Sequence, residues 1–217
     1  MGDIFREVDE ELKQERYEKL WRQYGKYIIG TAVLLVAAVA GWKAWQSHQT
    51  SQRLAEGERF TAGSELLLDG KSAEAYQVFA GISADTRSGY GILAKFYEAS
   101  IVAGGDDPTK SIRIYDAIAA DSSAPLSLRD LAKVLGALQG LRSSTIDSKI
   151  IADRVRPMSG AGKAYRHVAL EIMALAAMKS GDTEAARGYY REIVDEPASA
   201  SGIRTRAAQM LNILGDS

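Results

Sequence analysis

Hydrophobic and polar positions recur with a helical period along most of this 217-residue chain, but one segment carries no charge. Residues 27–42 (YIIGTAVLLVAAVAGW) are uncharged, with Lys26 before them and Lys43 after them. An α-helix rises about 1.5 Å per residue, so the segment must extend to Trp45, with the Lys43 ammonium reaching the headgroups, to cross a ~30 Å hydrocarbon core. The sequence therefore predicts one transmembrane helix over residues 27–45.

The flanks of the apolar segment predict that it is a retained membrane anchor. Aromatic side chains favour the two membrane interfaces, and this segment has a pair at each end, namely Tyr24, Tyr27, Trp42 and Trp45. The alternatives are a cleaved signal peptide and the buried core helix of a soluble domain. A signal peptide begins with a short basic region, whereas 26 residues with seven acids precede this segment. Burial in the core of a soluble domain does not explain why aromatic residues are grouped at both ends of the segment.

The basic residues around the segment predict its orientation. Five of them lie just before it, whereas only Lys43 and Arg53 lie in the comparable stretch after it. Lys and Arg concentrate on the cytoplasmic side of membrane helices. We therefore expect the N-terminus in the cytoplasm and the C-terminal domain on the far side of the membrane.

Residues 1–26 predict a cytoplasmic amphipathic helix. Apolar residues recur near helical spacing among many Glu, Lys and Arg side chains; they are Ile4, Phe5, Val8, Leu12, Leu20, Trp21 and Tyr24. Such a helix can lie on the inner leaflet or dock on a protein. The alternative is a solvated charged helix that leads into the membrane.

Beyond the apolar segment the chain repeats itself. Small residues recur at intervals of 38, 37 and 38 residues, and a large apolar residue stands four positions before each. The small residues are Ala94, Ala132, Ala169 and Ala207, and the large ones are Tyr90, Leu128, Tyr165 and Ile203. A large and a small residue four positions apart share one face of a helix, and the small one lets a neighbouring helix come close. We call helices of this kind A helices.

A second amphipathic stretch, the B helix, follows each A helix after a breaking residue. Matching positions include Phe79, Tyr115 and Tyr190, and a looser copy spans residues 147–157. Asp107 and Asp182 stand where a helix begins, so we expect them to cap B helices. We expect A helices near residues 50–68, 87–103, 126–141, 163–179 and 199–214. One hairpin cannot bury both its faces, so the copies must stack. The sequence predicts an all-α fold in which residues 46–217 form an α-solenoid of helical hairpins.

Composition excludes several classes of function. The chain has 27 Lys and Arg against 28 Asp and Glu, so it lacks the positive field that binding to nucleic acid requires. It has no cysteine, so a disulfide, a thiolate nucleophile and a Cys-ligated metal are excluded.

Candidate catalytic motifs are incomplete. The stretch PMSGAGKA at residues 157–164 lacks the first glycine and the final Ser or Thr of a phosphate-binding loop. His167 and Glu171 share a helical face, but His48 is the one other histidine in the sequence and a metal needs more ligands. We expect no enzyme activity, no cofactor, no metal and no small-molecule substrate.

The hairpin pattern resembles tetratricopeptide repeats over about 165 residues, with a period longer than the usual 34. In such repeats the exposed concave positions lie three residues before and one residue after the small alanine. These positions, with one further lysine, give the predicted protein-binding residues Lys95, Arg129, Lys133, Lys163, Arg166 and Arg204. Stacked guanidinium groups suit carboxylates, so we expect a groove for acidic or C-terminal segments. The alternative is that these cations are solvated.

The opening sequence IFREVDEELKQERYEKLWRQYGKYIIG, one span and the repeats together resemble the ancillary subunits of the bacterial Sec translocon. The resemblance implies a single-pass inner-membrane scaffold whose periplasmic domain associates with the translocon membrane subunits. It also implies contact with periplasmic chaperones that receive emerging chains. Two alternatives stay open: a scaffold for envelope assembly with another partner, and a cytoplasmic regulator that acts through the N-terminal helix.

Overall fold

The structure is a computed structural model that describes residues 3–84, 89–105 and 107–215, with side chains described from Trp21 onward except at residue 28. Within these ranges the regular structure is helical and no strand is present. The expected all-α class is therefore confirmed. The predicted amphipathic character of residues 1–26 depends mostly on side chains that lie outside the described residues, and it stays a prediction.

Helices α1 to α9 follow one another along the chain. Their bounds are α1 (Asp3–Leu68), α2 (Ser72–Ser83), α3 (Gly89–Ala103), α4 (Pro108–Ala120), α5 (Leu126–Arg142), α6 (Ser148–Val155), α7 (Arg166–Lys179), α8 (Thr183–Asp195) and α9 (Ser201–Leu214). A short 3-10 helix, Arg156–Met158, follows α6. The expected A helices correspond to the end of α1 and to α3, α5, α7 and α9, and the B helices are α2, α4, α6 and α8.

Two helix boundaries differ from expectation. The A helix expected from residue 163 begins at Arg166, because the preceding segment forms the 3-10 helix and then turns at Gly162, whose φ is +75°. The expected span and the first A helix are one uninterrupted helix, α1. No proline stands anywhere before Pro108, so the chain has no strong helix breaker between the two.

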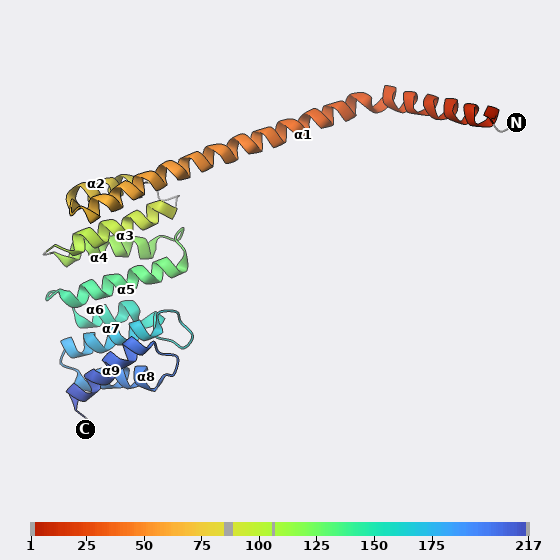
Figure 1. Ribbon diagram of the computed structural model, residues 1–217. Helices are drawn as coiled ribbons and strands as arrows, with labels where there is room; N and C mark the ends of the chain where they lie inside the picture. The colour runs from red at the N-terminus through yellow and green to blue at the C-terminus, as the bar shows by residue number, and fades with distance from the viewer. Residues whose placement is uncertain (1–2, 85–88, 106, 216–217) are drawn as a thin grey trace. The chain divides into compact units, whose positions relative to one another are not determined.

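The chain divides into two compact units, Met1–Ala55 and Glu56–Ser217. The predicted domain boundary at residue 46 lies within α1, which continues past the apolar segment, and the end of α1 packs with the hairpins in the second unit. We refer to Glu56–Ser217 as the hairpin unit. Its helices follow one another in chain order (Figure 1). Each helix from α2 to α9 packs on the next one in the chain, and α7 also contacts α5 and α9.

The small residues of the repeat lie at the closest contacts, as the spacing predicts. Ala94, Ala132 and Ala169 are fully buried and Ala207 is 1% exposed. Gly140 on α5 has the same function, because a Cβ atom there would lie 3.0 Å from Cγ1 of Ile151 on α6. The aromatic residues of the B helices fill the space beside these contacts: Phe79, Tyr115 and Tyr190 are all at most 3% exposed.

Two features shape the turns between hairpin helices, namely glycines with positive φ and aspartates that cap the next helix. Gly70 and Gly181 adopt positive φ values of 76° and 83° and reverse the chain after α1 and α7. Asp107 and Asp182 then cap α4 and α8, as expected, by accepting hydrogen bonds from Thr109 N at 2.9 Å and Ala185 N at 3.0 Å. The pKa of the Asp107 carboxyl lies below its ordinary value, because the hydroxyl and the backbone N–H of Thr109 both donate to it.

Candidate membrane anchor and protein-interaction surface

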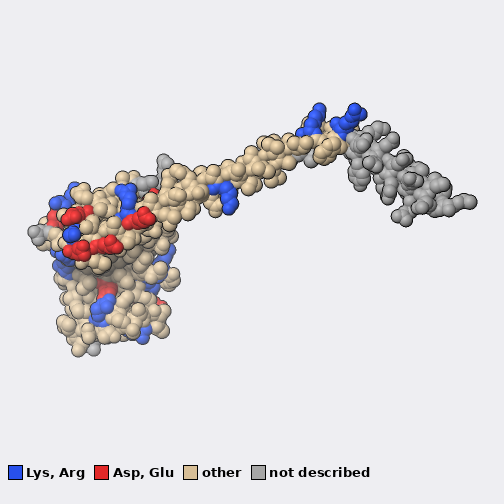
Figure 2. Space-filling model, turned by 45° about the horizontal axis from the view of Figure 1, so that its top comes forward, with Lys and Arg blue, Asp and Glu red and all other residues tan. Residues whose placement is uncertain are grey.

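The apolar part of α1 is the feature that distinguishes the first unit. From Ile29 to Trp42 the large apolar side chains are more than half exposed, and Leu34 is 72% exposed. Figure 2 shows this part of α1 as an uncharged surface with basic side chains on either side. Among the described residues, one helix is long and apolar enough to cross a membrane, and it contains this stretch. Exposed apolar area costs about 25 cal/mol per Å² in water, so the stretch favours an apolar environment.

The three predicted arginines have intramolecular partners. Each donates to a backbone carbonyl: Arg129 to the last turn of α4, and Arg166 and Arg204 to the segments that lead into their own helices. Arg129 Nε donates to Ala119 O at 3.1 Å, and Arg204 Nη2 donates to Pro197 O at 2.8 Å. Arg166 donates to Ser159 O and also pairs with Glu192 at 2.6 Å and Glu196 at 3.0 Å, and only 14% of its side chain is exposed.

The three predicted lysines have different surroundings. Lys133 pairs with Asp130 at 3.0 Å on its own helix, and Lys163 is exposed in the turn before α7. The positive charges of Lys95 and Arg129 both act on the Asp121 carboxyl. The pKa of the Asp121 carboxyl is lowered, first by hydrogen bonds from Ser123 and then by these two cations. The binding of a partner's carboxylates by the six predicted cations stays a prediction.

A second set of cations, which the sequence analysis missed, joins consecutive A helices. Arg142 Nη1 at the end of α5 donates to Ala103 O at the end of α3, at 2.9 Å. Lys179 at the end of α7 donates to three carbonyls at and after the end of α5. They are those of Gly140 at 3.2 Å, Ser143, and Ile146 at 3.4 Å. Helix C-termini carry partial negative charge, so a cation there is stabilising. Both cations stand ten residues after a repeat alanine, and that spacing is visible in the sequence.

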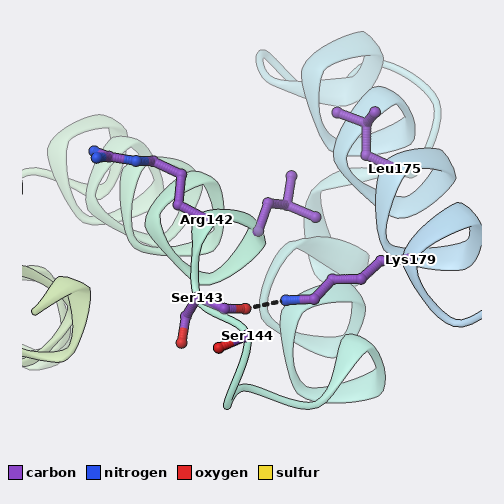
Figure 3. Close-up of a pocket in the computed structure, with 6 residues that line it drawn as sticks. Arg142, Ser143, Ser144, Leu175 and Lys179 are labelled. Atoms are coloured by element: carbon purple, nitrogen blue, oxygen red, sulfur yellow. Dashed lines mark hydrogen bonds between the residues drawn. The ribbon is translucent and has the colours of Figure 1, made fainter. Parts of the chain in front are cut away.

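Arg142 and Lys179 also line an open pocket of about 420 Å³ between α5 and α7. Its other lining residues are Leu141, Ser143, Ser144 and Leu175. In Figure 3 the Lys179 side chain reaches from α7 toward the Ser143 carbonyl, with Leu175 one turn earlier on the same helix. The pocket combines apolar walls with two cations.

His167 and Glu171, which share a face of α7, have different interaction partners. His167 Nε2 lies 3.9 Å from the carboxylate of Glu196. Glu171 instead accepts both hydrogen bonds of Arg206 on α9, at 2.7 and 2.8 Å. Across the described part of the chain, no group of three or more His, Cys, Asp or Glu residues is placed to hold a metal ion.

We predict that Lys179→Met destabilises the hairpin unit by about 1–2 kcal/mol, because it removes charged hydrogen bonds to three carbonyls while keeping an unbranched apolar side chain. The measurement is urea unfolding of the full chain in mild detergent, followed by helical circular dichroism. Arg191→Met, at an exposed position on α8, is the matched control and should change the free energy of unfolding by less than about 0.5 kcal/mol. Equal effects of the two variants would contradict the conclusion that the hydrogen bonds of Lys179 stabilise the hairpin unit.

Comparison with known proteins agrees with this architecture. A family model described as a tetratricopeptide repeat-like domain matches residues 18–139, a range that includes the apolar stretch and the first hairpins. A Haemophilus influenzae protein named "Ancillary SecYEG translocon subunit" is 24% identical over 92 residues, which is 42% of this chain and 45% of that protein. The alignment thus spans less than half of the relative's length. No solved structure matches the chain. The chain belongs to the tetratricopeptide repeat-like domain family.

Proposed function

We propose that this protein is a membrane-anchored scaffold associated with the bacterial Sec translocon. The observation that carries the proposal is the similarity to a protein named as an ancillary translocon subunit. The matched family range, which contains both an apolar helix and stacked hairpins, supports it. In this proposal residues 27–45 cross the bacterial inner membrane, the N-terminus is cytoplasmic and the hairpin unit is periplasmic.

The scaffold would act by raising local concentration and not by chemistry. A binding unit tethered to the membrane converts a second encounter into an intramolecular one, with an effective concentration that reaches the millimolar range for short tethers. The partners on the membrane side are the translocon membrane subunits. Periplasmic chaperones on the other side would then be held where unfolded chains emerge.

The proposal predicts recovery of the translocon with this protein. Native membranes are crosslinked, the full chain is purified in mild detergent, and its stoichiometric companions are identified by mass spectrometry. We expect SecYEG subunits and periplasmic chaperones. Recovery of envelope-assembly proteins without any translocon subunit would contradict the proposal and favour the envelope-scaffold alternative. Deletion of residues 1–22 tests the cytoplasmic-regulator alternative, which predicts loss of function while translocon recovery is unchanged.

The orientation is tested by labelling with a membrane-impermeant maleimide, which the absence of cysteine makes straightforward. Gly188→Cys places a thiol at an exposed position on α8, and Gln14→Cys places one before the span. In intact spheroplasts we expect labelling of the Gly188→Cys variant alone, and labelling of both variants after lysis. Labelling of the Gln14→Cys variant alone in intact spheroplasts would reverse the orientation.

A further inference from the structure

The A helices present a line of exposed apolar side chains that the core does not use. Two positions of the repeat, one residue before the small alanine and six residues after it, lie seven residues apart and so share one face of the helix. Leucine or isoleucine occupies five of these positions on four successive A helices. We call this set the A-helix strip: Leu93, Leu131, Leu138, Leu175 and Ile213.

Exposure separates the strip from the core. Leu93 is 40% exposed, Leu138 is 38% exposed and Ile213 is 74% exposed. Leu131 and Leu175 are half-buried. None of the five residues is part of, or packed against, the four hydrophobic clusters that form the core of the described chain. Single exposed apolar side chains are ordinary, but here they recur at five of the eight equivalent positions, which makes the strip a candidate interaction surface. The other three positions are Ser100, Arg206 and Val168, of which Val168 packs against the core.

The dimensions of the strip fit one α-helix. Seven residues along an A helix cover about 10.5 Å, which matches the 10–12 Å diameter of a helix with its side chains. Helices in contact lie about 8–10 Å apart, and α7 contacts both α5 and α9. If the same spacing is assumed between α3 and α5, the four A helices extend over about 24–30 Å. A partner helix laid across them would need about 16–20 residues to reach from one end of the strip to the other.

The cations beside the strip indicate which charge a partner would carry along one edge. Arg142 and Lys179 are exposed, and Leu175 of the strip lines the same pocket as both (Figure 3). Their hydrogen-bond partners are neutral groups, namely backbone carbonyls and the Gln139 side-chain amide. In the part of the chain that the structure describes, neither cation has a carboxylate within 4 Å. A partner with acidic side chains along one edge therefore complements this side of the strip.

We propose that the A-helix strip binds an amphipathic α-helix of another protein, with leucine-type residues on its apolar face and acidic residues along one edge. The proposal depends on the proposed function only in treating the hairpin unit as a docking surface. It differs from the predicted carboxylate groove in its residues, because none of the six predicted cations belongs to the strip. It also differs in its main contact, which is apolar.

The test uses a synthetic helical peptide of about 18 residues, a length that follows from the extent of the strip. The peptide has leucines on one face and glutamates along one edge, and it carries a fluorophore. Fluorescence anisotropy measures its binding to the full chain in phosphatidylcholine nanodiscs, with empty nanodiscs as the blank. We expect saturable binding that is weaker when the glutamates are replaced by lysines.

Two variants of the same helix locate the binding site. Leu138→Glu lies in the strip, and Leu126→Glu lies outside it on α5, where Leu126 is 66% exposed. We expect Leu138→Glu to weaken binding by at least about tenfold and Leu126→Glu to leave it unchanged, with equal helical circular dichroism. Arg142→Glu should bring the affinities for the acidic and basic peptides together or reverse their order.

Several results would overturn the proposal. They are no saturable binding, equal loss in the Leu138→Glu and Leu126→Glu variants, and equal affinity for a proline-interrupted peptide that cannot form a helix. Self-association of the full chain that Leu138→Glu abolishes would instead assign the strip to a second copy of this chain. If SecYEG copurifies and the peptide does not bind, only the strip proposal fails. If the peptide binds and SecYEG is absent, only the proposed function fails.

Discussion

The hairpin unit depends on the close approach of neighbouring helices at one small residue in each repeat. Where Ala94, Ala132, Ala169 and Ala207 stand, at most 1% of the residue is exposed. A larger side chain at such a position would separate the helices, because packed interiors have little space to absorb added methylene groups. Close approach in turn buries the B-helix aromatics, and each buried side chain of this size contributes about 1.5–3 kcal/mol. The repeat thus places the core between the hairpin helices and leaves one apolar face of the A helices exposed.

Several cations of the hairpin unit donate hydrogen bonds to backbone carbonyls. The last carbonyls of a helix have no partner within it and carry partial negative charge. Arg142 and Lys179 supply donors to such groups across one repeat, Arg129 supplies a donor to the last turn of α4, and Arg204 supplies donors to the segment before α9. Arg142 and Lys179, the cations beside the A-helix strip, are therefore held in place by the fold.

The sequence predicted most of the fold because helix period and repeat spacing are local properties. All five expected A helices have a counterpart in the structure, the first of them as the end of α1, and the repeat alanines are buried as expected. The start of α7 was wrong by three residues, because the glycine-containing segment before it has no helical signal to separate it from the helix. The partners of the arginines were not predictable, since a carbonyl seven to ten residues away comes within reach only through the geometry of the turn. The exposure of the A-helix strip was not predictable, because a single sequence does not show whether another helix covers a given leucine.

A double-mutant cycle between Gly140 and Ile151 tests close approach most directly, because a Cβ at residue 140 would lie 3.0 Å from Ile151 Cγ1. The free energy of unfolding is measured for the wild-type chain, Gly140→Ala, Ile151→Ala and the double variant. If α5 and α6 approach closely at Gly140, the double variant is less destabilised than the sum of the two single variants, and we expect a coupling energy of at least about 1 kcal/mol. The methyl group added at residue 140 then fills space that the shortened residue 151 vacates. Additivity within about 0.5 kcal/mol would contradict close approach, because it would mean that the helices do not meet at this glycine.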